Sequence, residues 1–360
     1  MGVPLHSRFR RKLKNFLNSI LRQCFSNEPS KQPIASDAIR TILVIRINYR
    51  IGNILFTTPI LKALEIEFTN ATIDILVGAE YTIPLLRGFK NVQNIYDFSR
   101  TLLKHPRELI RHIRQLRSKH YDLVLNLNLG SASDRAATFL AKGTYKLGFD
   151  YPNEWSPLTH TVPPPNTIVH EAIKPLYLMQ AFNKSPDQYP QRMDIGLDPM
   201  EKERGFHALR KQLLKQGKNL HPSDVIIGMF RDARFEKKID PSWWNEWQIE
   251  MQRYFPDAVF VDILSPDVTK KLNDNVFEFM EKNLRQLGAS LSQMSIFVCG
   301  DTGPMHLASA SFVPTCALFK TTTPTLYGTL GDNDLSLEIA KLSVQETAAL
   351  IQNHLHRILP

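Results

Sequence analysis

The stretch SIFVCGDTGPMHLASASFVPTCALF, residues 295–319, is typical of a strand, a helix and a second strand in one parallel sheet. Ser295–Gly300 and Pro314–Phe319 are short apolar runs, as expected of strands that helices cover on both faces. Between them, Asp301 and Thr302 are residue types that cap a helix. A strand, a crossover helix and a parallel strand are the unit of a doubly wound α/β fold.

The same alternation extends along most of the chain. Strands are predicted at 41–47, 72–78, 92–98, 122–128, 224–230 and 259–264, and helices at 54–68, 100–119, 243–254 and 336–358. A proline-rich patch and the polar stretch 184–222 interrupt this rhythm. We therefore expect two Rossmann-like domains, 40–195 and 196–335, facing each other across a cleft, with a closing helix at 336–360 and a separate segment at 1–39.

The positive charge is concentrated at the N-terminus. The net charge is +9, and residues 1–33 hold seven Lys or Arg side chains against one acid, Glu28. At the angular spacing of a helix, the apolar residues of 8–25 fall on one face and the basic ones on the other. Such a basic amphipathic helix can lie on an anionic membrane, and the same pattern also suits a helix that packs on the protein itself.

Composition limits the remaining classes of function. Hydrophobic residues make up 43% and charged residues 22%, as in a globular chain, and no apolar run reaches the ~20 residues that span a bilayer. The three cysteines, Cys24, Cys299 and Cys316, show no zinc-binding spacing, so no zinc site is expected, and we expect no cofactor. The body outside the N-terminus is close to neutral, which argues against nucleic acid as a partner.

Three loops at strand ends carry the candidate chemistry. In the first, the N–H groups of Gly303, Met305 and His306 start a helix and predict a phosphate or diphosphate site, with Asp301 facing a sugar hydroxyl. An ordinary capped turn is the alternative. The second loop, INYRIGNILFTTP (47–59), contains neither G-x-G-x-x-G nor a P-loop, which argues against nicotinamide dehydrogenases and P-loop kinases. In this loop Asn53 is a good helix cap, and Pro59 predicts a kink in the helix that follows.

The third loop, FRDARFEKKIDPSWW (230–244), brings four cations to the end of a strand: Arg231, Arg234, Lys237 and Lys238. They are candidates for holding phosphate, and a solvated charged loop is the alternative.

Residues 284–324, which contain Asp-Thr-Gly-Pro-Met-His-Leu-Ala, closely resemble the donor-site signature of the family-9 glycosyltransferases, the lipopolysaccharide heptosyltransferases. ILVIRINYRIGNILFTTPILKALE (42–65) resembles the family's first strand, loop and helix, and HEAIKPLYLM (170–179) resembles its helix near the end of the first half. The resemblance implies a GT-B fold and inverting, metal-independent transfer from a nucleotide sugar, ADP-heptose in named members. The acceptor, typically the lipid A–Kdo inner core, would lie against the first half.

The resemblance also implies roles for individual residues. Asp301 would hold the sugar, and Lys238, three residues before a proline as in the family's Lys-x-x-Pro pattern, would neutralise the departing diphosphate, with Lys237 as the second candidate. Further donor-site residues would line the diphosphate and nucleotide: Thr302, Gly303, Met305, His306, Phe319, Lys320 and Thr321.

Two positions depart from the family pattern. Asn53 stands where the family usually has the aspartate presumed to deprotonate the acceptor, and an amide is not a useful base at neutral pH. Asp134, in the loop after the fourth strand, is the candidate substitute, and its alternative role is that of a helix N-cap. Lys320 replaces a small glycine and adds a cation near the nucleotide.

These observations predict a cytoplasmic glycosyltransferase, peripheral at the inner face of the bacterial inner membrane, that acts on a glycolipid acceptor. Two alternatives remain open at this point. One is a member that binds nucleotide sugar without transfer, and the other is a nucleotide-sugar epimerase or hydrolase of the same fold.

Overall fold

The computed structural model describes residues 28–99, 101–102, 105–128, 130–150, 155–233, 235–265, 268 and 270–359. The basic helix expected over residues 8–25, and Arg234, lie outside these residues. Within them, no helix combines the length and the apolar character needed to cross a bilayer.

The first sheet has six strands, all parallel, in the order β3-β2-β1-β4-β5-β6. They are β1 (Thr41–Arg46), β2 (Thr72–Val77), β3 (Val92–Asp97), β4 (His120–Asn126), β5 (Lys142–Phe149) and β6 (His160–Val162). This is the Rossmann order. The first three strands are added toward one edge of the sheet, and the chain then crosses back so that β4 pairs with β1 and the remaining strands extend toward the other edge.

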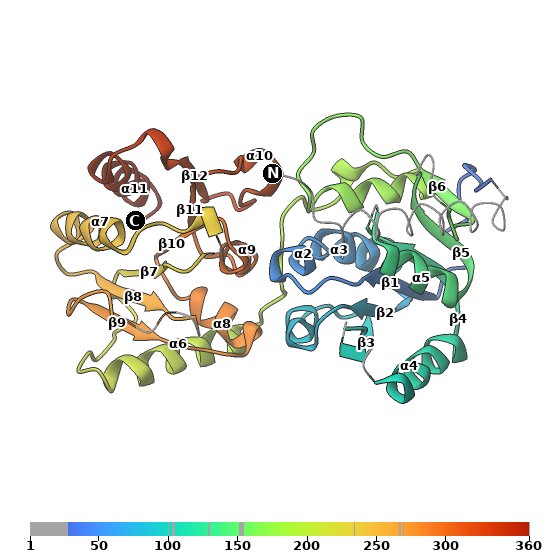
Figure 1. Ribbon diagram of the computed structural model, residues 1–360, viewed down its shortest axis with the longest axis horizontal. Helices are drawn as coiled ribbons and strands as arrows, with labels where there is room; N and C mark the ends of the chain where they lie inside the picture. Colours follow the sequence, from blue (N-terminus) through green and yellow to red (C-terminus); the bar gives the residue numbers. More distant parts are fainter. Residues whose placement is uncertain are drawn as a thin grey trace, which may run out of the picture.

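The second sheet repeats this order with six more parallel strands, β9-β8-β7-β10-β11-β12. They are β7 (Ile226–Phe230), β8 (Val259–Ile263), β9 (Val276–Phe279), β10 (Ile296–Gly300), β11 (Thr315–Phe319) and β12 (Leu335–Glu338). Two Rossmann-like sheets side by side (Figure 1) confirm the expected GT-B architecture.

Helices cover both sheets. The first domain has α2 (Ile51–Leu55), α3 (Thr58–Glu67), α4 (Pro106–Ser118), α5 (Ala132–Leu140) and the 3₁₀ segments η1 (Glu80–Leu86), η3 (Lys174–Phe182) and η4 (Pro186–Gln188). The second has α6 (Pro199–Leu214), η5 (Phe235–Lys237), α7 (Pro241–Tyr254), α8 (Leu284–Leu291), α9 (Gly303–Ala310), α10 (Pro324–Tyr327), η6 (Ile339–Lys341) and α11 (Val344–Ile358).

Three expectations need correction in detail. The helix predicted over 54–68 is broken into α2 and α3, because Pro59 lacks an N–H and begins a new first turn. Asn53 is inside α2, whose N-cap is Arg50. The closing helix starts at Val344, not at 336, because residues 335–338 form edge strand β12 and Ser343 makes a capping box.

The core lies between the sheets and their helices. All five residues of β7, β8, β10 and β11 are buried, and so are five of the six residues of β1. On one side of the second sheet, Trp244 and Trp247 of α7 are almost completely buried. These apolar strands bring their carboxyl ends, and the loops that follow them, into fixed positions.

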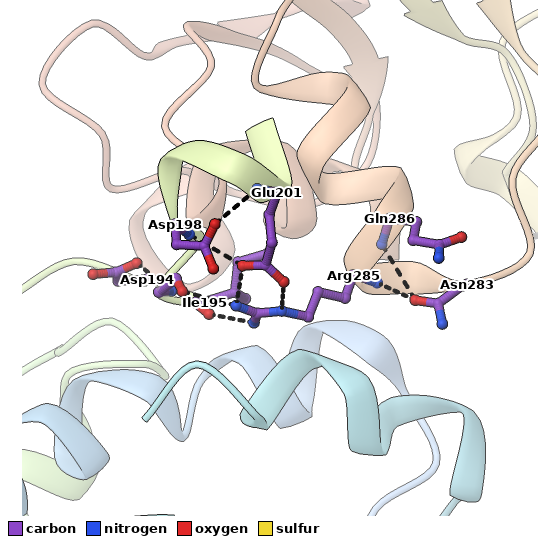
Figure 2. A network of polar contacts seen from close by, with 8 residues as sticks. Asp194, Ile195, Asp198, Glu201, Asn283, Arg285 and Gln286 are labelled. Carbon is purple, nitrogen blue, oxygen red and sulfur yellow. Dashed lines mark hydrogen bonds and ion pairs between the residues drawn. The ribbon is translucent and has the colours of Figure 1, made fainter. Parts of the chain in front are cut away.

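The segment that joins the two domains is held by Arg285 of α8. Its guanidinium makes two hydrogen bonds to Glu201, at 2.6 and 2.7 Å, and donates to the carbonyls of Ile195 and Gly196 at 2.7 and 2.8 Å (Figure 2). Gly88 of the first domain lies against the same two carbonyls, so closely that a side chain there would lie 2.1 Å from the Ile195 oxygen. The connection is therefore clamped from both domains.

Candidate functional site

The loops after β1 and β10 meet where the domains touch. α2 of the first domain packs on α9 of the second, near the middle of Figure 1. A Cβ on Gly52 would lie 2.5 Å from Cδ2 of His306, and one on Gly303 would lie 3.1 Å from Cβ of Ile51. Two glycines thus permit a close approach between the loop that resembles an acceptor site and the loop that resembles a donor site.

Asp301 is the centre of the donor side. Its carboxylate, 9% exposed, forms an ion pair with Lys237 and accepts a hydrogen bond from the Thr322 hydroxyl at 2.6 Å. The two partners come from different loops, after β7 and after β11. The carboxylate is therefore fixed in place at the end of β10, where it can accept further hydrogen bonds from a sugar hydroxyl.

The start of α9 presents backbone donors. Thr302 is the N-cap, with extended backbone, but its side chain makes no capping bond and its hydroxyl donates to the Gly300 carbonyl at 3.2 Å. Pro304 is at the first turn and has no N–H. The first N–H groups of α9 are therefore not satisfied by a side-chain cap, and they carry the positive end of the helix dipole, an arrangement suited to an anion.

Met305 and His306 lie behind this surface. Met305 is fully buried in the second-domain core, and His306 is 5% exposed with its ring edge-on to Phe56 at 4.8 Å. Burial lowers the pKa of His306 to about 3, so the ring is neutral, and within the described residues its Nδ1 has no hydrogen-bond partner. Any contribution of these two residues to an anion comes from their backbone.

The remaining donor-side residues divide into two groups. Lys238 is exposed, and its carbonyl accepts a hydrogen bond from Nζ of Lys320 at 3.3 Å. Phe319 is 1% exposed at the end of β11, and Thr321 follows it on the more open loop. The structure thus brings Lys237 onto Asp301 and leaves Lys238 on the rim of the same loop.

Arg231 is not a phosphate ligand here. Its guanidinium donates to one oxygen of Asp262 at 2.9 and 2.6 Å and to the Lys270 carbonyl at 3.0 Å. The Arg231 and Asp262 side chains are 8% and 2% exposed, and burial raises the pKa of Asp262 despite its arginine partner. This cation of the 230–244 loop is therefore part of a buried structural pair.

On the acceptor side, Asn53 and Asp134 lie near one cation. Arg46, at the end of β1, is 9% exposed and donates from Nε to the backbone carbonyl of Asn53 at 3.3 Å. Its positive charge also lies close enough to Asp134 to favour the ionised form of that carboxyl. Asp134 is completely buried near the start of α5, and Ser131 donates to its Oδ1 at 2.8 Å. Its Oδ2 has no hydrogen-bond partner within the described residues.

Burial raises the pKa of Asp134 to about 6, although hydrogen bonds from Ser131 and the charge of Arg46 oppose this effect. The expectation that Asp134 is the N-cap of its helix is wrong, because Ser131 is the N-cap and accepts from the Asp134 N–H at 3.2 Å. A buried carboxylate whose pKa lies near 6 and which has an unpartnered oxygen is a candidate acid–base group.

Sequence reasoning missed three residues of this region. Arg46 interrupts an apolar strand, a signal that was readable, whereas Thr322 was indicated only as part of the segment 319–324 expected to border the nucleotide, and not as a partner of Asp301. His170 was quoted only as part of a motif; its Nδ1 accepts from the Ala172 N–H at 3.1 Å, and its Nε2 donates to the Gly328 carbonyl at 3.0 Å. It thereby ties the first domain to the loop after α10, and its ring is 5.6 Å from that of Phe56.

In the part of the chain that the structure describes, no three His, Cys, Asp or Glu side chains gather closely enough to hold a metal ion.

Comparisons with known proteins point to one class of enzyme. Residues 276–351 match the family described as glycosyltransferase family 9 (heptosyltransferase). The chain is 24% identical over 290 residues to lipopolysaccharide heptosyltransferase 3 of Escherichia coli, covering 75% of this chain and 81% of that protein. The corresponding enzyme of strain K12 is 23% identical, with 75% and 80% covered.

Solved structures show the same fold. The E. coli heptosyltransferase WaaC with ADP superposes with a TM-score of 0.70 at 18% identity, covering 87% of this chain and 99% of that one. A family 9 glycosyl transferase from Veillonella parvula gives 0.74 at 15% identity, covering 90% and 99%. These matches and this fold support a glycosyltransferase that is similar to the heptosyltransferases of family 9.

Proposed function

We propose that this protein transfers a heptose or a similar sugar from ADP-heptose to the core of lipopolysaccharide or to a related surface glycolipid, with inversion at the anomeric carbon. The observation that carries the proposal is Asp301, fixed by Lys237 and Thr322 beside the start of α9 at the junction with the first domain. Two E. coli relatives that the chain matches over three quarters of its length are lipopolysaccharide heptosyltransferases.

The donor lies along the loops of the second domain. Its diphosphate accepts hydrogen bonds from N–H groups at the start of α9, with Gly303 allowing close approach, and Thr302 lines the same turn. Asp301 accepts a hydroxyl of the sugar. Lys320 and Thr321 border the nucleotide, and Phe319, whose side chain is buried at the end of β11, can contribute only through its backbone. Lys238, on the rim, stabilises the charge that builds on the nucleoside diphosphate as it leaves.

The acceptor lies against the first domain. Its hydroxyl oxygen attacks the anomeric carbon as the bond to the diphosphate breaks, and its proton must pass to a base. Asn53 orients the hydroxyl through its amide, and Asp134 takes the proton, because its pKa near 6 leaves it ionised at neutral pH.

The site of action follows from the acceptor. A glycolipid acceptor is displayed on a membrane, so we place the protein in the cytoplasm, peripheral at the inner face of the bacterial inner membrane. The basic residues of 8–25 would hold it at anionic headgroups.

The test is nucleoside-diphosphate release by the purified protein over a panel of nucleotide sugars that includes ADP-heptose, with and without deacylated lipopolysaccharide core. Release that needs both donor and acceptor supports the proposal and names the donor. Release without acceptor indicates a hydrolase, and donor binding without any release indicates a member that has lost transfer with the aspartate at position 53.

A variant makes this test specific to the site. Asp301→Asn keeps the shape of the side chain but removes the charge that pairs with Lys237, and turnover should fall by at least about 100-fold. The matched control is Asp332→Asn, which removes an exposed carboxylate paired with Arg192 and should keep wild-type turnover. Equal activity of the Asp301 variant and wild type would overturn the donor-site assignment.

A further inference from the structure

The positive surplus of the protein body is concentrated on α4. Outside residues 1–33 and α4, the chain carries 33 basic and 33 acidic side chains. α4 itself holds four arginines, Arg107, Arg111, Arg114 and Arg117, and one acid, Glu108. A single helix of 13 residues therefore accounts for the whole net charge of the body.

The four arginines share the outward face of this helix. At the angular spacing of a helix they fall within about 120° of one another, and all four are exposed. The buried residue of α4 is Leu116, on the opposite face. Among the residues that the structure describes, no acidic side chain forms an ion pair with any of the four. Figure 1 shows α4 at the outer edge of the first domain.

Another cation and two apolar side chains adjoin this face. Burial lowers the pKa of Lys146 of β5, and the nearby charge of Arg117 lowers it further. Lys146 therefore adds a cation beside the arginine face. Its Nζ donates to the Phe139 carbonyl at 3.4 Å. The side chains of Ile110, on the arginine face, and Phe139, on α5, are 49% and 48% exposed.

We propose that this α4 surface, made of Arg107, Arg111, Arg114, Arg117, Lys146, Ile110 and Phe139, docks on a lipid bilayer with anionic headgroups. The arginines match the negative charge of such a surface. Ile110 and Phe139 favour a bilayer over nucleic acid, because apolar side chains can enter the boundary between headgroups and acyl chains. The surface belongs to the described body and does not depend on residues 8–25 or on the identity of the acceptor.

Binding of the full-length chain to vesicles tests this proposal. Vesicles of phosphatidylglycerol in phosphatidylethanolamine are compared with vesicles of phosphatidylcholine alone in a sedimentation assay. The variant R107Q/R111Q/R114Q should bind the anionic vesicles at least about tenfold more weakly than wild type. Ile110→Ser should weaken binding severalfold, because it removes apolar contact without changing charge.

A matched control removes the same charge elsewhere. R204Q/K211Q/K215Q takes two exposed cations from α6 and a third from its C-cap in the second domain, and it should bind within about twofold of wild type. Both triple variants should keep the wild-type melting temperature and wild-type turnover of a soluble acceptor. Vesicle binding is read without any transfer reaction, so its result stands apart from the success or failure of the proposed function.

Three results would overturn the proposal. The first is wild-type vesicle binding by the α4 variant, with binding lost instead in R8Q/R10Q/R11Q. The second is an equal loss in the α6 control, which would indicate a response to net charge alone. The third is a wild-type protein that ignores anionic vesicles but binds a DNA or RNA oligonucleotide through α4.

Discussion

Gly52 lies directly against the imidazole of His306, 254 positions later in the chain, so that a Cβ at Gly52 would lie 2.5 Å from Cδ2 and 3.1 Å from Nε2 of the ring. The ring has no free space to retreat into, because it is almost completely buried and packs edge-on against Phe56. The contact joins the loop after β1 to the helix after β10 and so sets the spacing between the two halves of the candidate site.

Gly52→Ala should therefore push α2 away from α9. An extra methyl in a packed contact costs about 1–3 kcal/mol of stability, and a displacement of about 1 Å between reacting groups can cost 100-fold in rate. We expect a lower melting temperature and at least about a tenfold loss of turnover. In a double-mutant cycle, His306→Ala should relieve part of the stability loss caused by Gly52→Ala. Strictly additive effects would show that the two residues do not press on each other.

Lys237 and Lys238 should give different kinetic signatures. Lys237→Ala leaves the almost buried Asp301 without its cation, so the donor KM should rise and the melting temperature should fall. Lys238 is exposed, so Lys238→Ala should keep the melting temperature and lower kcat by about tenfold or more. Steady-state kinetics with varied donor and a thermal melt separate the two. The control is Lys211→Ala, which removes an exposed lysine of α6 and should keep wild-type kinetics. A wild-type kcat in Lys238→Ala would instead assign stabilisation of the departing diphosphate to Lys237.

The strands that sequence reasoning located are those with long apolar runs, such as β1, β7 and β10. Their positions were predictable because a strand covered on both faces must be apolar along its length. Four strands were not predicted, because they lie at or next to a sheet edge and are short or mix polar with apolar residues: β5 (KGTYKLGF), β6 (HTV), β9 (VFEF) and β12 (LSLE). The doubly wound arrangement of each sheet followed from the alternation of strands and helices, and of the four edge strands only β3 was predicted.

The candidate site was predictable loop by loop but not as an assembly. The sequence indicated Asp301 and the start of α9, because their signals are local. It did not indicate that Lys237 and Thr322 converge on Asp301 from 64 positions before and 21 after. Nor could it distinguish an Asp134 that caps its helix from one that is buried in the first turn, because the choice depends on where the helix begins, and Ser131 is the N-cap.

The raised pKa of Asp134 predicts how activity depends on pH. If Asp134 takes the proton of the acceptor, it must be ionised, so kcat/KM should fall about tenfold for each pH unit below about 6. Asp134→Asn should lose at least about 100-fold in kcat and should also lose this acidic limb. The control is Asp74→Asn, another buried carboxylate of the first domain, which should keep the limb. An unchanged limb in Asp134→Asn would assign the base elsewhere.

The same pKa predicts a change of stability with pH. The folded chain holds the proton of Asp134 up to about pH 6, whereas the reference value for an exposed aspartate is 3.8. The folded state thus binds more protons within this window, so its stability falls as the pH rises, by at most about 3 kcal/mol. Urea unfolding at pH 4.5 and 7 should show this fall in wild type relative to Asp134→Asn. A difference of opposite sign would show that Arg46 outweighs burial.

Arg285 should be the residue on which the connection between the domains most depends. Removing Arg285 leaves Glu201 without a bidentate partner and leaves the Ile195 and Gly196 carbonyls without their donor. The side chains of Arg285 and Glu201 are only 13% and 18% exposed, so water replaces these contacts poorly. Arg285→Ala should therefore cost about 2–4 kcal/mol in urea unfolding, and Arg285→Lys should recover only part of it, because lysine cannot form the same fork. The control is Arg253→Ala, which removes an arginine that is 69% exposed from its pair with Glu250 and should cost about 1 kcal/mol or less.

The stability that Arg285 and Glu201 contribute should depend on pH. The hydrogen bonds from Arg285 are the largest cause that lowers the pKa of Glu201, so the pair stabilises the folded chain above the unfolded pKa of glutamate and loses this effect as the pH falls through the lower folded value. The penalty of Arg285→Ala should accordingly be full at pH 7 and should shrink below pH 4. A penalty that stays constant over this range would mean that Arg285 acts through the two linker carbonyls alone, since a carbonyl does not titrate and the Glu201 carboxylate does.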